Sequence, residues 1–167
     1  MYAFAKNSLV RRTSLALILL PFASQAIAEQ THGHDNKVHG PHIVEFFLGA
    51  TSADHHGHTE QAGSLGASYR YAFNHTVSAG VLAEYTGGAL DHWVVGIPFV
   101  FNLGHGGWQG TLMPGAEITS SHEEALFRVG VGYEFELDGY ALKPELNVDF
   151  VNGETVVVLG ASIGFRF

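Results

Sequence analysis

The last thirteen residues of the chain, 155–167, constrain its fold more than any other stretch. Read in steps of two, T-V-V-V-L-G-A-S-I-G-F-R-F separates into one apolar set of residues and one set that is mostly small or polar. Because successive side chains of a strand point to opposite faces, this alternation predicts a β-strand with one apolar face. A strand of a soluble sandwich and a wall strand of a barrel both fit it. The apolar set is Phe167, Phe165, Ile163, Ala161, Leu159, Val157 and Thr155, and the other set is Arg166, Gly164, Ser162 and Gly160, followed by Val158 and Val156.

The first 28 residues have the pattern of a secretory signal peptide. Lys6, Arg11 and Arg12 precede a short apolar run, 15–20, and the segment ends in Ala26-Ile27-Ala28, a small-x-small cleavage site. The apolar run is too short to cross a bilayer as a helix. We therefore expect cleavage after Ala28, which leaves a chain of single-domain length.

The charge of the remaining chain excludes one class of function. The signal peptide contains three of the eight basic residues and none of the sixteen acidic ones, so the mature chain is strongly acidic. A nucleic-acid-binding protein needs the opposite balance, and we expect no nucleic-acid partner. The chain has no cysteine, which excludes disulfides, thiol chemistry and a lipid-modified cysteine anchor.

The rest of the chain divides into eight segments with strand alternation. Short turn signals separate some of them, among them Asn74-His75, Asp138-Gly139 and Asn152-Gly153. Longer polar stretches at 51–61, 86–91 and 119–124 are expected to be loops. An even number of strands places both ends of a barrel on the same side. The expected strands are 42–50, 62–73, 76–85, 92–101, 109–119, 125–137, 140–151 and 155–167.

Aromatic residues favour a membrane barrel over a soluble sandwich. With the strands arranged up and down, the outward-facing aromatic residues gather into two rings, as the two interfaces of a bilayer require. One ring holds Phe73, Phe101, Tyr133, Phe135, Tyr140, Phe165 and Phe167, and the other holds Tyr85, Trp93, Phe127 and Phe150.

The polar faces of the strands collect nearly all the cations of the mature chain. An eight-stranded barrel has room inside for side chains and little more, so we expect these groups to form a packed ionic core, with inward glycines making room for them. Pro98, Pro114 and Pro144 fall inside expected strands, where we expect each to need a bulge or a rim position. The residues assigned to the ionic core of the lumen are Glu45, Arg70, Glu84, Glu117, Arg128, Glu134, Lys143, Glu145, Asp149 and Arg166.

These features together resemble the small eight-stranded outer-membrane barrels of bacteria, the group of the OmpA membrane domain, OmpX, OmpW and PagL. The resemblance covers 41–167 and rests on strand count, aromatic rings and the terminal Phe. It implies an all-β, eight-stranded antiparallel up-and-down transmembrane β-barrel in the outer membrane of a Gram-negative bacterium. Residues 29–40 are then a flexible, histidine-containing periplasmic segment, and both termini are periplasmic. Phe165 and Phe167 would belong to the signal that the barrel assembly machinery reads. The other expected partners are outer-membrane lipid and lipopolysaccharide, with the protein a monomer.

Three functions fit such a barrel, and fold alone does not choose between them. The first is a non-enzymatic barrel with a charge-filled lumen, structural or interacting through its outer loops; a porin-like pore is disfavoured, because open channels need more strands. The second is a lipid A deacylase, with Ser120, His122 and Glu124 on one face of an extended loop. The deacylase family keeps His before Ser within one strand, and this chain departs from that order.

The third function is metal binding by histidines. Seven of the eleven histidines lie between His32 and His58, and short His-rich tracts bind zinc, nickel or copper. The two tracts flank the first strand and would lie on opposite sides of the membrane, so they cannot share an ion. We expect no tightly bound cofactor and at most weak metal binding. The candidate ligands are His32, His34, His55, His56 and His58.

Overall fold

The computed structural model describes residues 40–55, 58–104 and 106–167. The predicted signal peptide and almost all of the segment 29–40 lie outside these residues, as do His32, His34 and His56. The described residues form ten strand segments and no helix. Among them, therefore, no helix is long and apolar enough to cross a bilayer.

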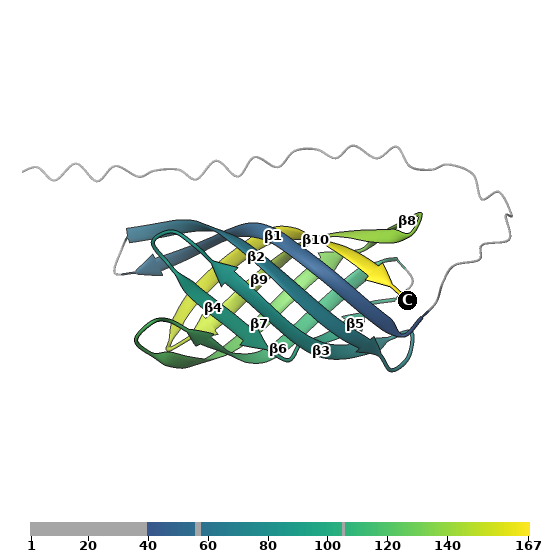
Figure 1. Ribbon diagram of the computed structural model, residues 1–167, viewed down its shortest axis with the longest axis horizontal. Coiled ribbons are helices and arrows are strands. Elements are labelled where there is room, and N and C mark those ends of the chain that lie inside the picture. Colours follow the sequence, from purple (N-terminus) through teal and green to yellow (C-terminus); the bar gives the residue numbers. More distant parts are fainter. Residues whose placement is uncertain (1–39, 56–57, 105) are drawn as a thin grey trace, which may run out of the picture. The chain divides into compact units, whose positions relative to one another are not determined.

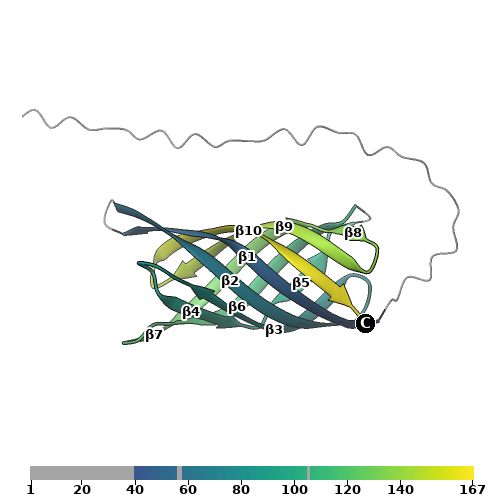
Figure 2. The same cartoon turned by 45° about the horizontal axis from the view of Figure 1, so that its top comes forward.

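The strand segments build one closed antiparallel barrel (Figure 1, Figure 2). Each wall strand pairs with its neighbours in sequence, and β10 pairs with β1 from Ile43↔Arg166 to Ala53↔Val156. Two wall strands are each divided into two segments, β4 with β5 and β7 with β8, so ten segments make eight strands. The segments are β1 (His42–His55), β2 (His58–Ala72), β3 (Val77–Thr86), β4 (His92–Gly96), β5 (Phe99–Asn102), β6 (Trp108–Ile118), β7 (Glu123–Tyr133), β8 (Phe135–Leu137), β9 (Tyr140–Val151) and β10 (Glu154–Arg166).

Burial is inverted relative to a soluble protein. Arg70 and Glu84 are among the largest fully buried side chains, whereas Leu48 is 72% exposed and Phe73 is 64% exposed. A sandwich in water would bury its apolar face and solvate its charges. This barrel places its apolar face outward, which is stable only when lipid covers that face, so the predicted all-β transmembrane barrel is confirmed.

The barrel has two distinct ends. At the first end, β1 begins and β10 finishes: His42 and Phe167 exchange backbone hydrogen bonds of 3.1 and 3.0 Å, and the C-terminus lies beside the start of β1 in Figure 1. We call it the terminal end. The hairpins after β1, β3, β6 and β9 lie at the other end, which we call the hairpin end.

Two of the predicted turns have the local chemistry that their sequences indicated. Leu137 pairs with Tyr140 across Asp138-Gly139, and Gly139 has a positive φ of 83°. Val151 pairs with Glu154 across Asn152-Gly153, where both turn residues have positive φ, 48° and 82°. Asparagine and glycine tolerate this conformation better than other residues, which fixes the position of each turn.

The predicted loop at 51–61 is wrong. β1 continues to His55 and β2 begins at His58, and the two strands pair without a shift from His42↔Tyr71 to His55↔His58. Thr51 and Ala53 are buried in the same inward phase as Glu45, so the strand alternation carries on beyond Ala50. The polar residues of this stretch therefore lie on an extended hairpin.

The three prolines do not require bulges, contrary to the expectation. On both sides of Pro98 the register stays constant: Gly96 pairs with Gly115 and Phe99 with Leu112. Pro98 has no N–H to donate, so one hydrogen bond of the ladder is missing there while the register is unchanged. The missing hydrogen bond divides this wall strand into β4 and β5. Nearby carbonyls still accept: Ile97 N donates to Pro114 O at 3.0 Å, and Gly80 N donates to Pro98 O at 3.2 Å. Pro144 likewise stays in register opposite Ala161.

Candidate functional site

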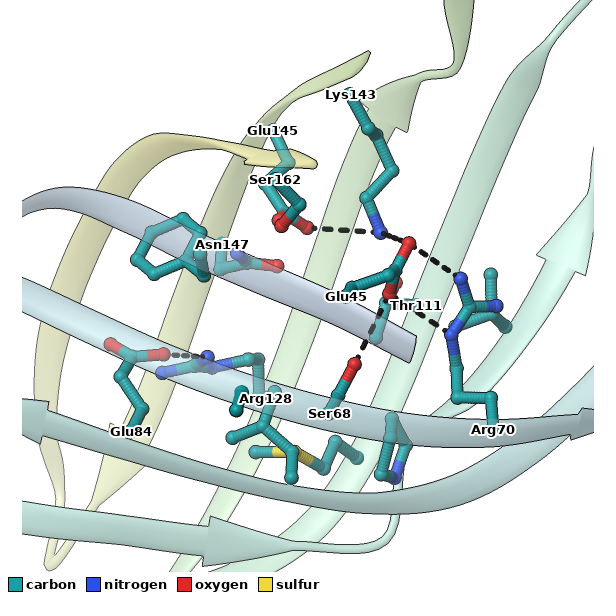
Figure 3. A pocket seen from close by; sticks show the side chains of 16 residues that line it. Glu45, Ser68, Arg70, Glu84, Thr111, Arg128, Lys143, Glu145, Asn147 and Ser162 are labelled. Carbon is teal, nitrogen blue, oxygen red and sulfur yellow. Dashed lines mark hydrogen bonds and ion pairs between the residues drawn. The ribbon is translucent and has the colours of Figure 1, made fainter. Parts of the chain in front are cut away.

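The lumen contains the densest group of charged side chains in the described part of the chain. Glu45, on β1, is its first centre. Glu45 Oε2 accepts from Arg70 Nε at 3.1 Å, and Glu45 Oε1 accepts from Lys143 Nζ at 3.0 Å and lies 2.7 Å from Arg70 Nη2 (Figure 3). Lys143 Nζ is also 3.5 Å from Glu145, which accepts a hydrogen bond from Ser162. We call Glu45, Arg70, Lys143 and Glu145 the Glu45 cluster; it contains two cations and two carboxylates.

Arg128, on β7, is the second centre. Its Nε and Nη2 donate to the two oxygens of Asp149 at 2.6 and 2.7 Å, a bidentate contact. Its Nη1 reaches across the lumen to Glu84 Oε2, on β3, at 2.6 Å (Figure 3). All three side chains are 2% exposed. We call Arg128, Asp149 and Glu84 the Arg128 cluster.

Two further residues of the predicted ionic core lie nearer the terminal end. Arg166 Nη2 is 3.8 Å from Glu134, whose other oxygen accepts from Gln109 Nε2 at 3.0 Å. The Arg166 side chain is 35% exposed, so this contact is partly solvated. The last predicted member, Glu117, lies toward the hairpin end, 3.7 Å from His92 Nε2.

Inward glycines leave room for these side chains at several levels. A Cβ at Gly132 would lie 3.1 Å from the Lys143 side chain, and one at Gly130 would lie 2.0 Å from the Asn147 amide oxygen. The chain therefore places long polar side chains beside positions that have no side chain at all.

Toward the hairpin end the lumen is filled differently. Val94, Met113, Leu126 and Val151 form one buried apolar cluster, which we call the apolar plug. Ala53, Val156 and Val158 form a second cluster beside it, with Phe47 and Leu90 packed against them. The alternation places Val156 and Val158 on the face opposite the apolar set, but apolar clusters in the lumen were not predicted, because the inward face was expected to form an ionic core. Met113 and Glu117 lie four residues apart on one strand, so their side chains point to the same face. The predicted inward position of Glu117 would therefore have placed Met113 in the lumen.

Three hydroxyl side chains are also buried toward the hairpin end. Thr51, Ser64 and Thr86 come from β1, β2 and β3, and each is at most 2% exposed. Thr51 bonds Ser64, and Ser64 lies 3.0 Å from Thr86 Oγ1. Each hydroxyl therefore has a partner on a neighbouring strand. We call these three residues the hydroxyl trio.

The free space inside the barrel is small. A cavity between the two charged clusters has a volume of about 30 Å³ for the centres of water-sized molecules, enough for about two waters. Both clusters line it, as do Thr111, Asn147 and Met113. The two charged clusters thus pack around a small polar cavity.

The outward aromatic residues fall at the two ends. Tyr85 and Trp93 lie 5.2 Å apart near the hairpin end. Near the terminal end, Tyr133 contacts Trp108 and Phe135, and His42 stacks on Phe167 at 5.6 Å. Trp108 was missing from the predicted ring because it falls just before the strand predicted from residue 109. Phe165 is exposed on the lipid face, as the alternation indicated.

The loop considered for acyl hydrolysis is exposed and bonded within itself. His122 Nδ1 lies 2.9 Å from the hydroxyls of both Thr119 and Ser121, and its Nε2 is 3.9 Å from Glu124. The hydroxyls at the imidazole are therefore those of Thr119 and Ser121, where the sequence suggested Ser120. Glu124 accepts a hydrogen bond from Asn152 at 3.0 Å, which links this loop to the β9–β10 hairpin.

The candidate metal ligands lie mostly outside the described residues. His55 and His58 face each other as the last pair of the β1–β2 ladder. Within the described ranges, no group of three or more His, Cys, Asp or Glu side chains is arranged to hold a metal ion.

Comparison with known proteins identifies the fold. No family model matches the chain, and no curated protein matches it by sequence. Among solved structures, Neisserial surface protein A matches with a TM-score of 0.62 and 12% identity, over 77% of this chain and 98% of that one. Ail of Yersinia pestis, in complex with the heparin analogue sucrose octasulfate, matches with a TM-score of 0.53 and 16% identity, over 77% and 99%. The N-terminal β-barrel domain of Pseudomonas aeruginosa OprF matches with a TM-score of 0.51 and 15% identity, over 75% and 98%. The fold is thus that of small outer-membrane β-barrels, in agreement with the predicted fold class.

Proposed function

We propose that this outer-membrane barrel is a non-enzymatic, non-conducting protein that acts through its hairpin end. The observation that carries the proposal is the filling of the lumen. Two ionic clusters and an apolar plug occupy the interior, and the cavity between them admits about two waters. An interior filled in this way argues against a continuous aqueous path for solutes, and the proposal therefore places the function at the lipid face and the ends of the barrel.

The charge of the hairpin end limits its partners. The described residues there include Asp91, Glu123, Glu124 and Glu154, while every described Lys and Arg points into the lumen or to the terminal end. A surface of this kind repels polyanions. Contact with lipopolysaccharide phosphates then needs bridging divalent cations. A cationic partner would bind directly.

Conductance of the purified barrel in planar lipid bilayers tests the first half of the proposal. We expect insertion without resolvable current steps in monovalent salt. An open porin in the same bilayers serves as the control for detection. Stable steps of porin size from the parent protein would contradict a non-conducting barrel.

Replacement of hairpin-end loops tests the second half. A variant in which residues 119–122 are exchanged for Asn-Gly keeps every inward side chain and is expected to fold normally, judged by heat-modifiable migration. In a deletion strain, we expect the parent gene, but not the loop variant, to restore envelope resistance to detergent. Full restoration by the loop variant would assign the role to the barrel wall instead.

Metal binding is the second candidate, favoured by one observation. The β1–β2 register makes His55 and His58 the last backbone pair of this hairpin, which brings two histidines of the tract to one position of the ladder. We expect the refolded barrel to bind zinc at about pH 7.5 and release it by about pH 5.5, because imidazoles protonate near 6.5. Calorimetry with a variant carrying His55→Ala, His56→Ala and His58→Ala is the measurement. Equal affinity of variant and parent would remove the metal role.

A further inference from the structure

The Arg128 cluster contains one more negative charge than positive charge. Two carboxylates, Glu84 and Asp149, share one guanidinium, and all three side chains are 2% exposed. The neighbouring Glu45 cluster is balanced, since Arg70 and Lys143 face Glu45 and Glu145. The surplus negative charge therefore belongs to the Arg128 cluster.

The same cluster contains an unpaired carboxylate oxygen. Both oxygens of Asp149 and Oε2 of Glu84 accept hydrogen bonds from Arg128. The remaining oxygen, Glu84 Oε1, is buried and has no hydrogen-bond partner among the described residues. The surplus charge and the unpaired oxygen thus coincide on one side chain.

A cavity adjoins this side chain. Glu84 and Asn147 line the space of about 30 Å³ between the two clusters, and Thr111 lines it on the side of Glu45 and Arg70, away from Glu84 (Figure 3). The Asn147 side chain is 4% exposed. The lining therefore includes hydroxyl and amide oxygens besides the carboxylate, and the space is large enough for an ion with one water.

From these three observations we propose that the lumen binds one small monovalent cation, Na⁺ or an ion of similar size, at Glu84 Oε1. An uncompensated charge is costly in a buried site, and a cation beside it removes that cost. Hard cations take oxygen ligands. The lining supplies carboxylate and amide oxygens, and the charges of the three cations that also line it, Arg70, Arg128 and Lys143, are already paired with carboxylates. A monovalent ion cancels the surplus of one charge, whereas a divalent ion would reverse it.

The test compares the stability of the refolded full-length mature protein in different salts. Urea unfolding in detergent micelles is followed by tryptophan fluorescence at fixed pH, with equal concentrations of sodium chloride or choline chloride. Choline is too large for the cavity. We expect Na⁺ to lower the unfolding equilibrium constant about tenfold at a concentration ten times its dissociation constant. In Glu84→Gln, which removes the surplus charge, we expect the two salts to give the same midpoint.

Glu134→Gln is the matched control, because it makes the same change in an inward carboxylate outside the Arg128 cluster. It should keep the preference for Na⁺. A preference for Na⁺ that survives Glu84→Gln would overturn the proposal. So would a parent whose midpoint is the same in both salts and rises only on acidification, since a proton on Glu84 would then balance the charge.

A series of ions on the parent alone gives a second measurement should Glu84→Gln fail to fold. A site of fixed size predicts different midpoints in lithium, sodium, potassium and rubidium chloride at one ionic strength. Identical unfolding midpoints across the series would mean that the salts act only by screening charges. That result would contradict a specific cation site.

Discussion

The two halves of the lumen are enclosed by the same eight strands but stabilised by different interactions. Nearer the terminal end, Glu45, Arg70 and Lys143 form ion pairs, and the Arg128 cluster extends this charged region to the level where the apolar plug begins, since Arg128 lies opposite Met113 and Glu84 opposite Val94 on neighbouring strands. Toward the hairpin end, the apolar plug and the hydroxyl trio fill the same kind of inward position. A charged half is stable only while each charge has its partner, whereas an apolar half tolerates any change that preserves its volume. The two halves should therefore respond differently to substitution.

The largest expected effect is in the charged half. Arg128→Ala would leave Glu84 and Asp149 buried together without a cation, and removal of one partner from a buried pair costs about 3–5 kcal/mol. Urea unfolding of the refolded barrel in micelles measures the loss. Arg166→Ala is the matched control: its pair with Glu134 is partly exposed and 3.8 Å long, so its loss should stay within about 1 kcal/mol. Equal, small losses for both would mean that water solvates the charged half.

The next largest effect is in the apolar plug. Met113 is fully buried there, and Met113→Ala should cost about 2–4 kcal/mol through lost contacts and a new cavity. Met113→Leu conserves volume and should cost less than about 1.5 kcal/mol. The same urea titrations measure both. If Met113→Leu destabilised the barrel as much as Met113→Ala, the plug would depend on more than its volume.

The smallest expected effect is in the hydroxyl trio. Thr51→Val removes one hydroxyl with little change in shape, and Ser64 and Thr86 can still bond each other at 3.0 Å. The loss should be about 1 kcal/mol, the net value of one hydrogen bond. Thr155→Val, on an exposed outward position, serves as the control and should be neutral. A loss from Thr51→Val as large as that from Arg128→Ala would abolish the contrast between the halves.

Strand alternation was sufficient to identify the barrel and the inward face of most strands. The outward and inward faces of β7, β9 and β10 could be assigned from the sequence alone. Side chains alternate between the two faces of a strand, so once the apolar face is identified, the remaining residues must face the lumen. The length of the first hairpin was missed because Asp54, His55 and His58 resemble loop residues. The inward phase of Thr51 and Ala53 would have shown that the strand continues.

The pairing of charges inside the lumen could be predicted from the sequence only in part. The inward positions suggest that Arg128 and Arg166 pair with Glu134, Glu145 or neighbouring inward acids, and Arg166 does lie 3.8 Å from Glu134. In the structure Arg128 contacts Asp149 on the adjacent strand and Glu84 on the far side. Contacts between strands that are not neighbours depend on the tilt and stagger of the whole barrel, which no single segment encodes. The hairpin-end plug was missed for a related reason, since hydropathy alone does not say which apolar residues face lipid.

The seam between β1 and β10 has a consequence for how the barrel forms. The hydrogen bonds between His42 and Phe167 join strands separated by nearly the whole length of the barrel sequence. We expect this contact to form last, since closing the longest loop has the largest entropic cost. Until then a partly formed sheet has two unpaired edges, which lipid cannot satisfy. Insertion should therefore be cooperative, with no stable intermediate in the bilayer, and a catalyst that holds both edges would accelerate it.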